Sequence, residues 1–186
     1  MEEPFFGITT TIDCTKAYAR SKELGVSFFT YYLHKTLLAV NAVENFRYRI
    51  IDDEVYLYDT IDVSATILRD DKTFGFSLMT YAEDLFEFAE ITKKEIERVK
   101  ATQGLITRDF EINLIHFSAL PWINFSSYSH ARSFTFPDSC PKVSFGKMTE
   151  EKGKKTMTTA VHVHHGLIDG YHVGELIQYF QEEMNR

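Results

Sequence analysis

The sequence predicts an α/β fold in which helices pack on one mixed β-sheet within a single domain. Runs rich in β-branched and aromatic residues alternate with runs whose apolar residues recur every three or four positions. The first pattern is typical of strands and the second of amphipathic helices. A length of 186 residues with 44% hydrophobic content suits one sizeable core. Residues 1–186 show no internal repeat, low-complexity tract or linker, so we expect one domain.

The individual elements follow from these patterns in order. Strands are expected at residues 8–13, 55–58, 62–68, 74–79, 113–118, 142–148 and 156–164, and helices at 28–44, 82–99 and 173–184. Acidic or glycine-containing turns separate the strands at 55–58, 62–68 and 74–79, which predicts antiparallel pairing among them. The strand at 156–164 is expected near the centre of the sheet.

Composition excludes several classes of protein. A formal net charge of −7 argues against a nucleic-acid partner bound through a basic surface. The cysteines, Cys14 and Cys140, are too few for a disulfide framework and lack CxxC metal spacing. We find neither a signal-peptide pattern at the start nor an apolar run of membrane-spanning length. The sequence therefore predicts a cytoplasmic protein with reduced thiols and no membrane partner.

The C-terminal stretch HVHHGLIDGYH carries the most chemical information. Side chains alternate along a strand, so His162 and His164 share one face while His165 points to the other. A neutral imidazole at this strand-to-loop junction can act as a general base, which makes His165 our candidate catalyst. Asp169 stands four residues later, where a short loop can fold its carboxylate toward the backbone around the imidazole. No metal is expected, because acidic or thiol ligands are missing at the usual spacings from these histidines.

Two segments together resemble one enzyme family. The segment HHGLIDGYHVGELI resembles a segment of the chloramphenicol acetyltransferase family of CoA-dependent acyltransferases. Condensation domains and dihydrolipoamide acyltransferases share the core of this motif. The segment SALPWINF, from Ser118 to Phe125, is nearly identical to a second segment of the same family. The likeness continues more weakly through residues 41–50 and 53–66, so it covers most of the chain.

This resemblance implies an acetyl-CoA-dependent O-acetyltransferase that acts on chloramphenicol or a similar small hydroxylated molecule. His165 would serve as general base, Ser118 would donate a hydrogen bond to the oxyanion, and Asp169 would hold the loop. Acetyl would pass directly from CoA to the hydroxyl, without a covalent acyl-enzyme. The resemblance also implies a homotrimer whose active sites lie at subunit interfaces.

Further positions are implied on the CoA side. Phe28 and Phe29 would line the pantetheine tunnel, and Trp122, otherwise a core residue by default, would form a hydrophobic wall near the cofactor. Lys147 would contact a CoA phosphate, and Ser144 stands where the family has threonine.

The sequence also departs from the family pattern. Ser27 replaces a lysine that precedes the aromatic pair. Met1 aligns well inside the pattern, so we expect the family's N-terminal segment to be missing, together with the arginine that would pair with Asp169. An unpaired buried carboxylate would be costly.

Two alternatives stay open. One is another acyltransferase of the superfamily, such as a dihydrolipoamide acyltransferase-like core. The other is a catalytically silent relative that binds CoA or a small ligand. Intact His165 and Ser118 favour an active enzyme.

Overall fold

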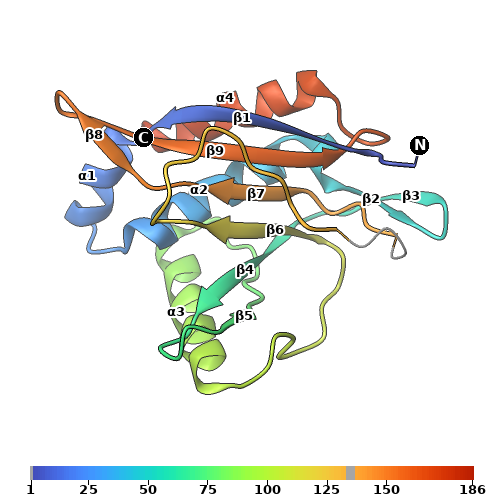
Figure 1. Ribbon diagram of the computed structural model, residues 1–186, viewed down its shortest axis with the longest axis horizontal. Coiled ribbons are helices and arrows are strands. Elements are labelled where there is room, and N and C mark those ends of the chain that lie inside the picture. The colour runs from blue at the N-terminus through green and yellow to red at the C-terminus, as the bar shows by residue number, and fades with distance from the viewer. Residues whose placement is uncertain (1, 133–136) are drawn as a thin grey trace.

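A computed structural model describes residues 2–132 and 137–186 and has one mixed sheet as its frame (Figure 1). Its strands are β1 (Phe5–Asp13), β4 (Asp62–Leu68), β5 (Phe74–Phe76), β6 (Leu114–Ala119), β7 (Lys142–Phe145), β8 (Thr149–Glu151) and β9 (Lys154–His164). Their order in the sheet is β1-β9-β7-β6-β4-β5, and β8 pairs with β9 outside this order. The central strands β4, β6 and β7 are parallel, and the flanking pairs are antiparallel. The α/β prediction is confirmed.

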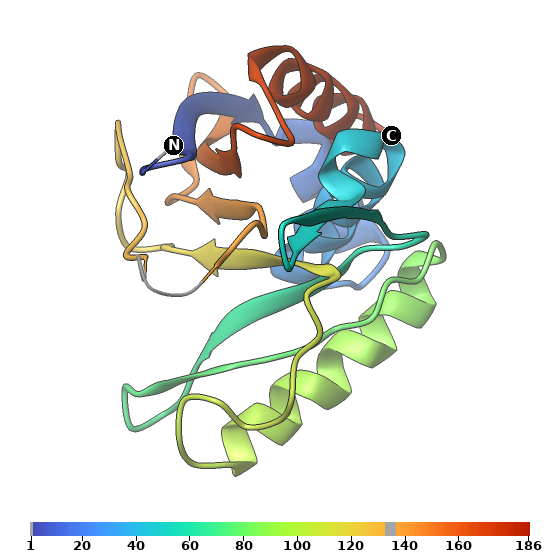
Figure 2. The same cartoon turned by 90° about the vertical axis from the view of Figure 1, so that its right-hand side faces the viewer.

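Helices cover one side of this sheet (Figure 2). They are α1 (Thr15–Glu23), α2 (Phe28–Ala42), α3 (Leu85–Ala101) and α4 (Gly170–Met184), with a short 3₁₀ helix, η1 (Glu44–Arg47). Side-chain caps begin three of them: Ser27 accepts from the Thr30 N–H at the start of α2, and Asp84 and Asp169 accept from the first turns of α3 and α4. Such caps satisfy backbone donors that have no partner within the helix. No helix in the described ranges is both long and apolar enough to cross a membrane.

Alternation along the strands separates two faces of the sheet. On the helix side, Phe117 and Phe145 are buried, and their rings pack against Tyr32 of α2. Their neighbours along the strands, Ser118 and Ser144, point to the opposite face. That face is crossed by the segment after β6, which lies opposite α2 and α4 (Figures 1 and 2). The core therefore lies between sheet and helices, and polar side chains occupy the other face.

Several sequence predictions need correction. The strand β3 (Glu54–Leu57) pairs with β2 (Tyr48–Ile51) and not with β4, because Asp52 and Asp53 both adopt positive φ and form a tight hairpin turn. The pairing of β4 with β5 is confirmed. We did not predict α1, β2 or β8. The strand β9 is interior, but it lies beside the edge strand β1 and not at the centre.

Candidate active site

His165 follows directly after β9. Its backbone N–H donates to the Pro4 carbonyl at 2.8 Å, which ties this end of β9 to the start of β1. His164 packs edge-on against Phe5, and His165 packs edge-on against Phe6, with ring centroids 5.5 and 4.9 Å apart. Because Phe5 and Phe6 are neighbours on one strand, the two histidines lie on opposite faces of the sheet. The predicted alternation is confirmed.

The imidazole of His165 is exposed. Within residues 2–132 and 137–186, its ring nitrogens make no hydrogen bond, so they are available to a substrate hydroxyl. The turn that carries it is held by the backbone, since the N–H groups of Leu167 and Ile168 both donate to the His164 carbonyl at 3.0 Å.

Asp169 caps α4. Its carboxylate accepts from the N–H groups of Tyr171 and His172 at 2.8 and 3.4 Å, and its own N–H donates to Nδ1 of His172 at 3.2 Å. Its side chain is 52% exposed, so the costly unpaired buried carboxylate considered from the sequence does not arise. Asp169 therefore fixes the start of α4 and, through it, the loop behind His165.

Ser118 lies near the end of β6 on the polar face. Its hydroxyl makes no hydrogen bond to any part of the chain that the structure describes. Two cavities meet at this residue, of about 270 and 250 Å³. A hydroxyl without a partner at such a junction can donate to a ligand in either cavity.

The two cavities differ in chemistry. The larger one, which we call the polar cavity, is lined by Ser64, Thr66, Phe76, His116, Phe117, Ser118, His130, Ala131, Arg132, Asp138 and Lys142. The smaller one, which we call the aromatic cavity, is lined by Thr66, Leu68, Phe74, Ser118, Ala119, Leu120, Trp122 and Tyr128. Ser118 and Thr66 belong to both.

Burial controls ionisation in the polar cavity. It lowers the pKa of His116 to about 4, with a smaller effect of the Lys142 charge in the same direction. The pKa of His130 is also lowered to about 4, by burial and then by His162. Burial alone would raise the pKa of Asp138, but the paired Lys142 ammonium and the Cys140 N–H together outweigh it, so that pKa is lowered. Both imidazoles are therefore neutral at pH 7.

One copy of the chain does not bring His165 and Ser118 together. Ser118 pairs with Ser144, and Ser144 pairs with Ala160 of β9. His165 lies five residues beyond Ala160 in the sequence, so it is roughly 16 Å along and about 10 Å across the sheet from Ser118. The two side chains also belong to opposite faces.

The positions implied for CoA do not all lie on the Ser118 face of the sheet, since Phe28 and Phe29 pack against the core on the helix side. Phe28 and Phe29 form the first turn of α2, and the Phe29 ring lies 6.0 Å from that of Phe117, on the strand that carries Ser118. Trp122 is 65% exposed and lines the aromatic cavity, so it is not a core residue. Lys147 is exposed, and its N–H donates to the Ile123 carbonyl at 2.8 Å, beside Trp122 in the sequence.

Ser144 differs from these positions. It is fully buried, and a hydrogen bond of 3.0 Å joins its hydroxyl to Nε2 of His130. Its hydroxyl is therefore already engaged within the chain.

The polar cavity contains residues that our sequence analysis missed. Alternation could have revealed His116, since it shares a strand face with Ser118. It could not have revealed His130 or Asp138, which come from the irregular segment between β6 and β7. His116, Asp138 and Cys140 offer ligand atoms within 4.8 Å of one another, a set suited to zinc. Because the Lys142 ammonium already pairs with Asp138, a cation would meet competition there, and we assign no metal.

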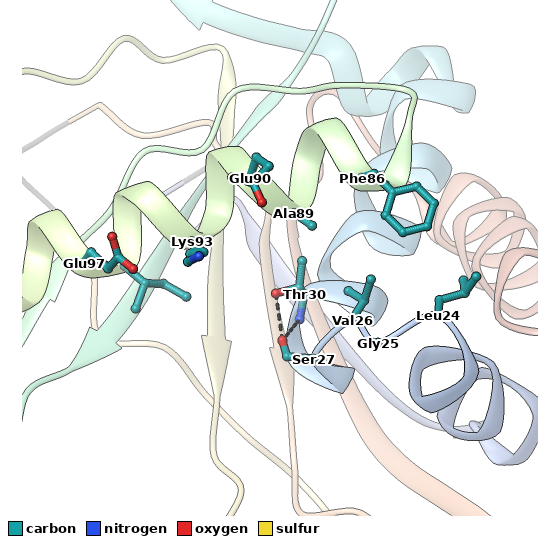
Figure 3. Close-up of a pocket in the computed structure, with 11 residues that line it drawn as sticks. Leu24, Gly25, Val26, Ser27, Thr30, Phe86, Ala89, Glu90, Lys93 and Glu97 are labelled. Carbon is teal, nitrogen blue, oxygen red and sulfur yellow. Dashed lines mark hydrogen bonds between the residues drawn. The ribbon is translucent and has the colours of Figure 1, made fainter.

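A further cavity, of about 560 Å³, lies between the start of α2 and α3 (Figure 3). Ser27 lines it, and its hydroxyl accepts a hydrogen bond from the N–H of Thr30 at 3.0 Å and donates one to the Thr30 hydroxyl at 2.8 Å. Lys93, Glu90 and Glu97 line its other wall, on α3. It contains no histidine, cysteine or unengaged serine, and Ser118 and His165 are not among its lining residues.

Comparison with known proteins identifies one family over nearly the whole chain. A family profile described as chloramphenicol acetyltransferase matches residues 3–181. A chloramphenicol acetyltransferase of Bacillus pumilus is 28% identical over 178 residues, which are 95% of this chain and 81% of that protein. A solved structure of a chloramphenicol acetyltransferase has a TM-score of 0.86 at 28% identity and covers 98% of this chain and 89% of its own.

A more distant structure shares the fold alone. It is that of a probable dihydrolipoamide acetyltransferase from Listeria monocytogenes, with a TM-score of 0.73 at 14% identity, and it covers 98% of this chain and 85% of its own. The family profile and the higher identities agree with the resemblance seen in the sequence, and the prediction of an acyltransferase-type enzyme is confirmed. The chain belongs to the chloramphenicol acetyltransferase family.

Proposed function

We propose that the protein transfers an acetyl group from acetyl-CoA to a hydroxyl of chloramphenicol or a similar small molecule. The observation that carries this proposal is the Ser118 hydroxyl, which has no partner among the described residues and faces two adjoining cavities. Two substrates that react directly need two adjoining spaces with a hydrogen-bond donor between them. The names of the relatives support chloramphenicol as an acceptor.

The chemistry follows from the properties of the groups. An alcohol does not ionise at neutral pH, so His165 removes its proton as the oxygen attacks the thioester carbonyl. A C–O bond forms, and the negative charge on the carbonyl oxygen accepts a hydrogen bond from Ser118. The C–S bond then breaks, and the imidazolium returns the proton to the leaving CoA sulfur. No metal takes part in these steps.

A second copy supplies the missing half of the site. The separation of roughly 19 Å between Ser118 and His165 in one chain, and their location on opposite faces, exclude a shared substrate within that chain. In a homotrimer, His165 of one subunit would face Ser118 of its neighbour, so each interface would hold one site. Exposure of His165 in the single chain supports this arrangement.

The cofactor is expected on the aromatic side of Ser118. Trp122 offers an apolar wall there, and Phe28, Phe29 and Lys147 remain our candidates for the pantetheine arm and a CoA phosphate. Ser144 is weaker as a direct contact, because His130 already engages its hydroxyl. We assign residues 1–186 to one domain, since the described strands of the central sheet come from both ends of the chain.

Release of CoA thiol from acetyl-CoA in the presence of chloramphenicol tests this proposal. His165→Ala should lower kcat by about two to four orders of magnitude, and Ser118→Ala by two to three. When the two variants are unfolded, mixed equally and reassembled, about a quarter of the interfaces should pair an intact His165 with an intact Ser118 and regain activity. Each variant unfolded and reassembled without the other is the control.

The same assay separates the alternatives. Failure of the mixture to regain activity, with the parent active, would contradict a site shared between copies. Faster release with dihydrolipoamide than with chloramphenicol would favour the second acyltransferase class. A folded parent that is stabilised by acetyl-CoA but releases no thiol with either acceptor would be a silent binder.

A further inference from the structure

The side chain of His164 binds the backbone on the far side of His165. Its Nδ1 accepts a hydrogen bond from the Gly166 N–H at 3.1 Å. A backbone N–H can only donate, so Nδ1 must carry a lone pair and the ring proton of the neutral imidazole must lie on Nε2. The backbone of the turn therefore selects one tautomer of His164, and His165 lies between the two residues that the bond joins.

Gly166 lies in close contact with this ring. A Cβ at position 166 would lie 2.9 Å from Cε1 and 3.1 Å from Nδ1 of His164, so the ring would have to move. Backbone conformation does not require the glycine, because its φ lies outside the left-handed region. The contact with the His164 ring is therefore the physical reason for a glycine at this position.

The His164 ring is also held from its other side. It packs edge-on against the Phe5 ring, with centroids 5.5 Å apart. The guanidinium carbon of Arg132 and the Nζ of Lys142 lie 3.8 and 4.5 Å from the centroid of the same Phe5 ring. Such cation–π contacts favour one position of the Phe5 ring, and that ring in turn supports His164.

The bond to Gly166 requires a neutral imidazole. Protonation of His164 would place a hydrogen on Nδ1, directed at the Gly166 N–H, and the acceptor would be lost. Burial lowers the pKa of His164, the Arg132 charge acts in the same direction, and the Asp138 carboxylate opposes them. The ring is therefore neutral at pH 7 and able to accept.

The two peptide planes that flank the Cα of His165 are each held by a hydrogen bond. The plane before it is held because the His165 N–H donates to the Pro4 carbonyl at 2.8 Å. The plane after it is held because the Gly166 N–H donates to His164. Together these bonds fix the backbone dihedral angles of His165 and hence the direction of its side chain.

We infer that His164 is a positioning residue, whose neutral ring holds the turn that presents His165 to the acceptor hydroxyl. This role rests on the proposed acetyl transfer, in which His165 is the base. His164 itself lies on the opposite face of the sheet and touches neither substrate. Its loss should therefore displace the base without altering the cavities, and a displacement of about 1 Å can lower a rate roughly a hundredfold.

Three substitutions at position 164 test this role. His164→Asn has its amide oxygen one bond from Cγ, where Nδ1 stands, so it can still accept from Gly166. His164→Gln carries the same amide one bond further out and is the matched control, and His164→Leu has no acceptor. With acetyl-CoA and chloramphenicol, kcat should fall about 10- to 100-fold in the glutamine and leucine variants and less than about threefold in the asparagine variant. KM should change by less than about twofold in all three, because the substrates bind beside Ser118.

A double-mutant cycle tests the contact between the two positions. Gly166→Ala should lower kcat in the parent, because its Cβ displaces the His164 ring. The asparagine variant lacks Cε1, so the same change should cost at least about fivefold less in His164→Asn. Equal costs in the two backgrounds would contradict the contact and overturn the inference.

Two NMR measurements are independent of catalysis. The ¹⁵N shifts of the His164 ring should identify the Nε2–H tautomer. The Gly166 amide hydrogen should exchange at least about fivefold faster in His164→Leu and His164→Gln than in the parent and His164→Asn. A parent that shows both results but releases no thiol would contradict the proposed acetyl transfer, while His164 would remain the residue that fixes the turn. An active parent in which the asparagine and glutamine variants behave alike, or in which Nδ1 carries the proton, would overturn the inference.

Discussion

The two faces of the central sheet are built from the same strands but have opposite properties. Phe117 is 1% exposed and contacts the rings of Phe29, Tyr32 and Phe145, whereas the hydroxyl of Ser118 beside it is unengaged among the described residues and lines two cavities. A period of two places neighbours on opposite faces. Along each strand, residues that stabilise the fold therefore alternate with residues that line the cavities. Substitutions at adjacent positions should have different consequences.

Phe117→Ala should give the largest effect, and it should be on stability. Removal of a buried aromatic ring costs about 3–5 kcal/mol of unfolding free energy through lost burial and the cavity left behind. Urea unfolding would measure this loss. Phe117→Leu fills most of the space and should cost less. If Phe117→Ala unfolded like the parent, the helix-side face would not be the main source of stability.

Ser118→Ala should give the reverse pattern. We expect kcat to fall by about two to three orders of magnitude, because an oxyanion donor is lost. The unfolding free energy should change by less than about 0.5 kcal/mol, since the hydroxyl makes no hydrogen bond within the described chain. Steady-state kinetics and urea unfolding of the same preparation would test both parts. A large loss of stability would show that Ser118 belongs to the structural face.

The division between faces also explains what the sequence could predict. The face of the sheet on which His165 and Phe117 lie can be predicted from the sequence, because it depends only on alternation along one strand. The place of His130 cannot be predicted in this way, since its contacts with Ser144 and His162 join an irregular segment to β7 and β9. The separation between Ser118 and His165 required the strand order, which local periodicity does not provide.

The fold, like the site, could be predicted where it depends on local periodicity. Helices and strands with a clear period were found within a few residues of their ends. The hairpin of β2 and β3 was not, because it depends on positive φ at Asp52 and Asp53, and aspartate adopts that conformation less readily than glycine.

The polar face should also make stability depend on pH. The pKa of His116 is about 4 in the folded protein, below the ordinary value of about 6.5. Between these values the unfolded chain binds a proton that the folded chain does not, so the unfolding free energy should fall as pH decreases from about 6.5 to 4. Above about pH 6.5 this contribution is fully present. Lys142, Asp138 and Arg49 provide the charges that act on the imidazole.

Urea unfolding at several pH values would measure this dependence. His116→Asn removes the titrating group but keeps polar atoms, so the stability of this variant should decrease less steeply as pH falls over this range. The difference between the two slopes should correspond to at most about one bound proton. An unchanged slope would mean that His116 is not buried as described. His34→Asn is a useful comparison, because burial also lowers the pKa of that histidine, which lies on α2 on the helix side.

Asp169 should give the smallest effect, although it lies near the catalytic candidate. Asp169→Ala removes the acceptor for the N–H groups of Tyr171 and His172 and should cost about 1 kcal/mol of unfolding free energy. Asp169→Asn keeps a capping oxygen and should be nearly as stable as the parent, with kcat within several-fold. If Asp169 instead oriented His165 as the carboxylate of a triad does, the asparagine variant would lose about four orders of magnitude in kcat while the cap survived. Because the carboxylate is half-exposed and already engaged by the first turn of α4, we expect the conservative variant to stay active.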